Sequence, residues 1–137
     1  MYNPRFPHKL KVWRGVLDEF GEPVVDPNTG NPRYVIVPLS VVQTIDGDPQ
    51  VDANGSLIID EVVEEIAFGY RTETRNTQIA GDVATSDFKL ACPMFVTPLK
   101  FGDILEMTDY DRTYKCSVIK KTDANWGSNI YCNEIRN

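Results

Sequence analysis

Three aspartates lie close together in the segment DGDPQVDANGS, and oxygen ligands at such spacing could hold a calcium ion. They are Asp46, Asp48 and Asp52. An EF-hand loop needs a glycine at its sixth position for the sharp turn. Counting from Asp48 places Ala53 at that position, and counting from Asp52 places Leu57 there. The segment therefore favours a solvated hairpin tip, in which Asp, Asn, Gly and Pro build turns, over a metal site.

The chain has a single histidine, and nucleophilic catalysis by serine or cysteine usually needs one as a base. His8 lies between Pro7 and Lys9 near the start of the chain, where a structural or surface role is favoured. A second candidate is Asp103, which follows Gly102 in KFGDILEM. The sequence places no histidine or further basic group that would make this carboxylate catalytic. We therefore expect Gly102 to form a turn and Asp103 to cap it through its side chain.

The cysteines are three in number, Cys92, Cys116 and Cys132, and they form no CxxC pair. A structural zinc site would need all three and the one histidine as ligands, and no pair of them has the short spacing typical of such sites, so we expect no metal. We expect reduced thiols that pack as small hydrophobic side chains in an intracellular product. The phosphate-binding patterns GxxxxGK[ST] and GxGxxG are absent, so we expect no cofactor. The sequence therefore shows no catalytic constellation, and it predicts a protein that is not an enzyme.

The length and charge of the chain limit the possible functions further. Its 137 residues suit a single domain with one core. A net charge of −6 argues against a dedicated nucleic-acid binder, which would normally present a basic face. No segment approaches the about 18–20 apolar residues of a membrane span. The start of the chain lacks the apolar core and cleavage site of a secretory signal.

The hydrophobic pattern predicts β-structure almost everywhere, in a small antiparallel β-barrel or sandwich with long loops and little helix. We expect a single β-barrel domain over residues 1–137, with an N-terminal arm over about residues 1–8. The expected strand segments are 9–17, 33–45, 57–74, 88–92, 104–108, 114–121 and 130–135. One segment, 59–68, could also form a helix, because four of its apolar residues would share a helical face. Its β-branched residues favour a strand.

Three stretches of the sequence resemble one protein family. They are NPRFPHKLKVWRG, then FGYRTETRNTQIAGDV followed by SDFKLACP, and GDILEMTDYDRTYKCSVIKKTDANWGSNIYCNEI. They look like small virion proteins of tailed bacteriophages, of the head-closure or stopper class of head–tail connectors. The resemblance implies a small β-barrel repeated in a six- or twelve-fold ring beneath the portal and its adaptor. Such a ring closes the DNA channel after packaging and docks the tail.

The resemblance also implies a location and partners for this chain. It implies synthesis in the host bacterial cytoplasm, assembly into the phage neck, no membrane contact, and non-specific proximity to packaged double-stranded DNA. Loops of such proteins reach into the channel, and the channel-loop candidates here are Asp46, Asp48, Asp52 and Asn54. The candidates for contact with partner proteins are Tyr2, Phe6, Arg75, Asn76, Gln78, Ile79 and Trp126. Trp126 lies in a short turn, where its ring either folds back on the barrel or meets a partner.

Three other functions remain open at this point. One is another ring of the neck: adaptors are commonly helical, and a tail terminator would carry a helix or two on its sheet, which only residues 59–68 could provide. A small barrel that binds single-stranded nucleic acid would need lysines or arginines clustered beside aromatic residues. A hydrolase that uses the acidic loops would need an identifiable acid–base pair, which the sequence does not place.

Overall fold

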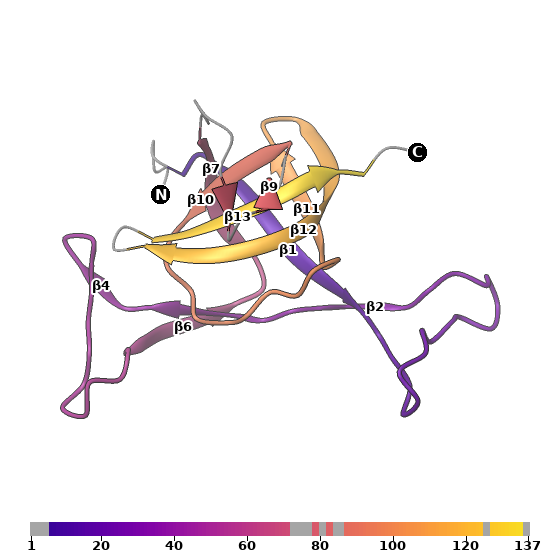
Figure 1. Cartoon of the computed structure of the whole chain (residues 1–137), viewed down its shortest axis with the longest axis horizontal. Helices are drawn as coiled ribbons and strands as arrows, with labels where there is room; N and C mark the ends of the chain where they lie inside the picture. The colour runs from indigo at the N-terminus through magenta and orange to yellow at the C-terminus, as the bar shows by residue number, and fades with distance from the viewer. Residues whose placement is uncertain (1–5, 72–77, 80–81, 84–86, 125–126, 136–137) are drawn as a thin grey trace.

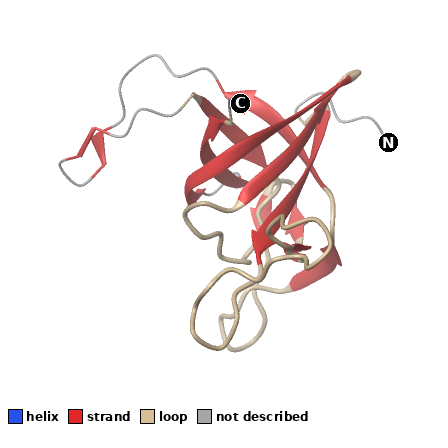
Figure 2. Cartoon of the chain, turned by 90° about the vertical axis from the view of Figure 1, so that its right-hand side faces the viewer, coloured by secondary structure: helices blue, strands red, loops and turns tan. Residues whose placement is uncertain are grey.

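Thirteen β-strands form the regular structure of the described part of the chain (Figure 1). The computed structural model describes residues 6–71, 78–79, 82–83, 87–124 and 127–135. None of these residues is helical (Figure 2). The strands are β1 (His8–Gly15), β2 (Tyr34–Ile36), β3 (Leu39–Val42), β4 (Thr44–Ile45), β5 (Asp48–Pro49), β6 (Ile59–Val63), β7 (Ile66–Arg71), β8 (Gln78–Ile79), β9 (Asp82–Val83), β10 (Phe88–Cys92), β11 (Ile104–Asp109), β12 (Arg112–Ala124) and β13 (Gly127–Glu134).

Six of these strands close into an antiparallel barrel. Hydrogen-bonded neighbours follow the order β11-β12-β13-β10-β7-β1, and β1 pairs again with β11. β2 extends the sheet beside the end of β1, while β3 with β6, β4 with β5 and β8 with β9 form small two-stranded sheets. Closure joins the two edges that an open sheet would leave unpaired. The prediction of a mainly β fold is confirmed, and closure decides for a barrel over a sandwich.

The barrel interior is filled by side chains because apolar residues alternate with polar ones along the strands. In β1, Leu10 and Val12 are buried, and they alternate with Lys9 and Lys11. The buried side chains inside the six strands are Leu10, Val12, Ile66, Phe68, Leu90, Cys92, Leu105, Met107, Cys116, Val118, Ile130 and Cys132. A barrel of this size leaves no room beyond its own side chains. Any function must therefore reside on the surface, on the loops or at the barrel ends.

Phe95 extends this core beyond the end of β10. Its ring is fully buried together with Val37 and Leu39, which precede and begin β3. The Lys121 ammonium lies 4.5 Å from the centre of the Phe95 ring and 2.8 Å from the Asp123 carboxylate. This packing fixes the base of the β3–β6 ribbon against the barrel.

The segment 59–68, which could have been a helix or a strand, forms two strands. β6 and β7 are separated by a bend at Glu64 and Glu65, so the strand prediction is confirmed and the helical alternative is wrong. β6 pairs with β3, whereas β7 belongs to the barrel. At the other end of the chain, β1 begins at His8, the last residue of the range expected for the N-terminal arm.

Candidate assembly surfaces

The chain leaves the barrel in two long excursions that project to opposite sides of the molecule (Figure 1). We call residues 16–33 the first arm and residues 43–58 the second arm. The first arm is held by three backbone hydrogen bonds that form a closed cycle. Val16 N–H donates to the Arg33 carbonyl, Arg33 N–H to the Val24 carbonyl, and Val24 N–H to the Val16 carbonyl, each at 2.9 Å. The chain thus passes the same junction three times and projects two separate tips.

The second arm has the same construction. Gln43 N–H donates to the Ile58 carbonyl at 2.8 Å, and Ile58 N–H donates to the Gln50 carbonyl at 2.9 Å. Gln50 N–H completes the cycle by donating to the Gln43 carbonyl at 2.9 Å. The two arms are therefore built on one hydrogen-bond scheme although their sequences show no obvious repeat.

One tip of each arm uses the same aspartate-based turn. In the first arm, Asp18 Oδ1 accepts hydrogen bonds from the N–H groups of Phe20 at 2.8 Å and Glu22 at 2.9 Å. In the second arm, Asp52 Oδ1 accepts hydrogen bonds from the N–H groups of Asn54 at 2.8 Å and Ser56 at 3.0 Å. A short carboxylate can serve the backbone of its own turn in this way.

A local sequence signal marks this shared turn. The segments DEFGE and DANGS both place an aspartate three residues before a glycine, and both glycines have positive φ. Leu17 pairs with Pro23 across the first turn, and Val51 pairs with Leu57 across the second. The spacing D-x-x-G between two bulky residues is therefore a sequence signal for both tips.

The arms expose large apolar side chains to solvent. Phe20, at a tip of the first arm, is 82% exposed. The other exposed apolar residues of the two arms are Leu17, Val25, Ile45, Val51 and Leu57. Scattered exposed apolar residues are ordinary, but two projecting arms that each carry several are typical of surfaces that become covered in an assembly.

The second arm and its base are strongly acidic. Between Tyr34 and Tyr70 the sequence contains seven Asp or Glu residues and no Lys or Arg. All seven are exposed: Asp46, Asp48, Asp52, Asp60, Glu61, Glu64 and Glu65. The acidic character of the whole chain is therefore concentrated in this region, because the net charge is only −6.

The structure places the four channel-loop candidates on the second arm, divided between its two tips. Asp46 adopts a φ of 52° in the turn between β4 and β5, and Asp48 lies in β5. Asp52 and Asn54 form the other tip. The interpretation of this segment as solvated turns is confirmed, because Asp52 directs its carboxylate at the backbone of its own turn.

The candidates for partner contact fall into three groups. Phe6 is buried, so the fold does not present its ring to a partner. Gln78 and Ile79 form β8, which pairs with β9. The remaining candidates, Tyr2, Arg75, Asn76 and Trp126, lie outside the described residues.

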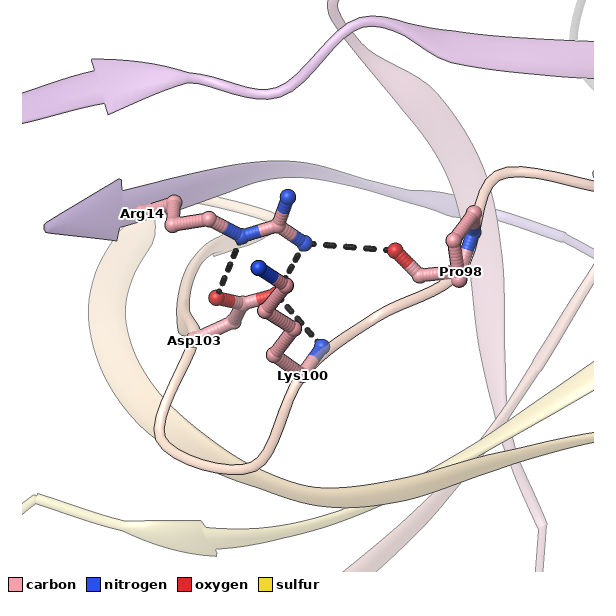
Figure 3. A network of polar contacts seen from close by, with 4 residues as sticks. All are labelled: Arg14, Pro98, Lys100 and Asp103. Carbon is pink, nitrogen blue, oxygen red and sulfur yellow. Dashed lines mark hydrogen bonds and ion pairs between the residues drawn. The ribbon is translucent and has the colours of Figure 1, made fainter. Parts of the chain in front are cut away.

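Asp103 lies at the centre of a buried polar network at the start of β11 (Figure 3). Its carboxylate accepts hydrogen bonds from Arg14 Nε at 3.0 Å and Arg14 Nη2 at 2.8 Å. It also accepts the Lys100 N–H at 2.8 Å, and Gly102 in the same turn has a φ of 90°. The predicted turn and cap are confirmed, whereas the partner Arg14 was not foreseen. The hydrogen bonds that Arg14 donates to Asp103 raise the pKa of Arg14.

His8 is buried at the mouth of the barrel beside Asp109. Its Nδ1 lies 3.3 Å from Asp109 Oδ1, which is ion-pair distance, although the two atoms are not aligned for a hydrogen bond. Asp109 also accepts the Tyr70 hydroxyl at 3.1 Å and Arg112 Nη2 at 3.4 Å. The rings of Phe68, Tyr70 and Tyr110 lie within 5.4 Å of the His8 ring, centre to centre. His8 is therefore a structural residue that joins β1, β7 and β11.

The three cysteines are free thiols in the barrel core. Burial raises the pKa of Cys92 to about 12. The pKa of Cys132 is raised by its hydrogen bond with Cys116 and by burial. Thiolate is the reactive form of cysteine, so Cys92 and Cys132 are inert in the folded protein. The expectation of reduced thiols that pack as small hydrophobic residues is confirmed.

Because the folded pKa of Cys92 is raised, its contribution to stability is complete below pH 9 and is lost as the pH rises to about 12. We expect the midpoint of urea unfolding to fall between pH 8 and pH 10.5. The matched variant Cys92→Ala should show a smaller fall over the same range, measured against its own midpoint at pH 8. An equal fall in both proteins would show that Cys92 does not contribute.

Among the described residues, no helix is long and apolar enough to cross a bilayer. Within the same residues, no group of three or more His, Cys, Asp or Glu side chains could hold a metal ion. Comparison with known proteins finds no matching family model, no matching curated protein and no matching solved structure.

Proposed function

We propose that this chain is a structural virion protein of a tailed bacteriophage, which forms a head-closure ring at the neck between the portal complex and the tail. The observation that carries the proposal is the pair of arms on a closed β-barrel. A filled barrel offers a rigid scaffold, and loops held on such a scaffold are where binding is usually placed. The resemblance to stopper proteins, which are small barrels that assemble in rings, agrees with this architecture.

The arrangement of the arms suits a ring of identical subunits. In a closed ring each copy uses two different surfaces, one for each neighbour, so the interface is heterologous. The two arms project to opposite sides of the barrel and differ in sequence (Figure 1). Their exposed apolar side chains supply surface that an isolated subunit leaves in water. A barrel with two such arms is therefore better suited to assembly than to action as a monomer.

The acidic second arm suits a position beside packaged DNA. Attraction between basic side chains and phosphate dominates DNA affinity, so a surface of carboxylates does not retain the polymer. Asp46 and Asp48 at one tip and Asp52 at the other would face the DNA channel in this proposal. The partners are then further copies of the chain, the portal and its adaptor, and the tail. The site of action is the virion neck.

Other ring proteins of the neck are the nearest alternative. A tail terminator would carry helices packed on its sheet, and none of the described residues is helical. This observation favours the head-closure ring over a terminator.

The proposal is tested by assembly with the portal complex of the same phage. Light scattering and negative-stain imaging should show a ring that forms alone or on the portal. Phe20→Ser, at a tip of the first arm, should reduce assembly about tenfold, because the phenyl side chain of Phe20 would be a buried anchor of the subunit contact. Phe101→Ser is the matched control, because Phe101 is 83% exposed against 82% for Phe20 but belongs to neither arm. A chain that stays monomeric and does not bind the portal complex would refute the proposal.

A further inference from the structure

A row of cationic and aromatic residues crosses the outer face of the barrel. Tyr131 in β13 lies directly opposite Lys89 in β10 on one side and Lys120 in β12 on the other. The Lys89 and Lys120 ammonium groups lie 5.2 Å and 4.7 Å from the centre of the Tyr131 ring. We call these three residues the Tyr131 cluster. The negative face of the ring attracts both cations and concentrates positive charge at one place on the barrel.

The neighbouring strand has a basic residue at the adjoining register position. Arg71 occupies the register position opposite Lys89 on β7. Three of four consecutive register positions across β7, β10, β13 and β12 are therefore Lys or Arg. Lys89 directly precedes Leu90, and Tyr131 directly follows Ile130; Leu90 and Ile130 are fully buried and point into the barrel. Because successive side chains of a strand point to opposite faces, Lys89 and Tyr131 belong to the outer face.

The Tyr131 cluster is better suited to carboxylates than to nucleic acid. Proteins that bind single strands stack bases on exposed aromatic rings. Tyr131 is only 8% exposed, so its ring is covered and cannot serve as a stacking platform. A dedicated nucleic-acid surface would also carry a larger excess of basic residues than this acidic chain provides. A small cluster of lysines suits a short acidic protein segment.

This chain itself carries a segment with the required chemistry. Asp60 and Glu61 lie in β6, and Glu64 follows directly after the strand ends. All three are exposed. The register with β3 shifts at Asp60 and the chain bends at Glu64, so these carboxylates form an acidic segment and do not share one strand face.

We infer that the Tyr131 cluster of one copy binds the acidic segment formed by Asp60, Glu61 and Glu64 in the next copy. This inference rests on the proposed ring, because it identifies the two different surfaces that a heterologous contact requires. Contact between two acidic arms would be repulsive, so charge complementarity directs the acidic region of one copy to the cationic row of its neighbour. Opposite charges also fix the register of the two copies.

Charge reversal tests the contact. Lys89→Glu with Lys120→Glu should reduce ring formation at least about tenfold, and Asp60→Lys with Glu64→Lys should do the same. The combination of all four changes in one chain restores complementary charges between neighbours and should recover rings. Lys9→Glu with Lys11→Glu, on the outer side of β1, is the charge-matched control and should leave assembly unchanged. Circular dichroism and urea unfolding establish that each variant is folded.

Each result decides the inference. Loss in both double variants with recovery in the combination supports it. Rings that are insensitive to the reversals would overturn this contact and leave the proposed function standing. Loss without recovery would show that the Tyr131 cluster binds another partner. That partner would be nucleic acid if the wild type retains DNA and the Lys89→Glu and Lys120→Glu variant does not. A wild-type chain that neither self-associates nor binds the portal would overturn the inference and the proposed function together.

Discussion

Replacement of Asp103 by alanine is expected to lower the free energy of unfolding by about 3 kcal/mol. The change removes a carboxylate that is 4% exposed and that accepts hydrogen bonds from Arg14 and from the Lys100 N–H. It leaves the Arg14 guanidinium without its counter-ion. Because the Arg14 side chain is 28% exposed, water can reach the remaining charge, and the cost falls at the lower end of the range for broken buried pairs. Urea unfolding at pH 7 measures the change.

Three further variants isolate the cause. Asp103→Asn keeps an oxygen that can accept a hydrogen bond, so it should lose less stability than Asp103→Ala. Arg14→Met combined with Asp103→Ala removes the orphaned charge and should recover part of the loss. Asp111→Ala, in the exposed turn between β11 and β12, should change stability by less than about 0.5 kcal/mol. If Asp103→Ala is as stable as Asp111→Ala, the network does not stabilise the fold.

Replacement of Gly127 by alanine is expected to cost about 3 kcal/mol or more, because the new methyl group has no space. Gly127 begins β13 with a φ of 149°, and a Cβ atom there would overlap the carbonyl oxygen of Cys92. That oxygen belongs to the backbone of β10, which cannot move aside as the end of a flexible side chain can. The midpoint of thermal or urea unfolding measures the loss.

Gly102→Ala is the matched control for this effect. Gly102 has a φ of 90°, but a Cβ atom added there would meet nothing within 4 Å. The cost should be limited to the backbone conformation, at about 1 kcal/mol. Equal losses in the two variants would show that conformation alone, and not the contact with Cys92, makes Gly127 necessary.

Most of the strands could be predicted because the side-chain pattern of a strand is local. In KLKV, at the start of β1, alternation of lysine with apolar residues determines which side faces the core. The predicted strand 88–92 coincides with β10. The segment 59–68 was harder, since its local pattern allowed two structures. Its division between the ribbon and the barrel depends on the separate partners β3 and β10.

The candidate site could be predicted only where single turns determine it. The exposed aspartates of the second arm follow from turn chemistry, which a few adjacent residues specify. The three-way junctions of the arms could not be predicted, because each joins residues from three separate passes of the chain. The Tyr131 cluster likewise depends on the register of β10, β13 and β12.

The sequence by itself determined a β-rich chain, the turn at Gly102 with its aspartate cap, and the acidic stretch between Tyr34 and Tyr70. These properties depend on neighbouring residues or on composition. Tertiary structure decided that the barrel closes, that Arg14 meets Asp103 across 89 residues of chain, and that His8 packs beside Asp109. The physical reason is that strand pairing is non-local. A strand displays its polar and apolar faces in its own sequence, but its neighbours are selected by the packing and loop closure of the whole chain.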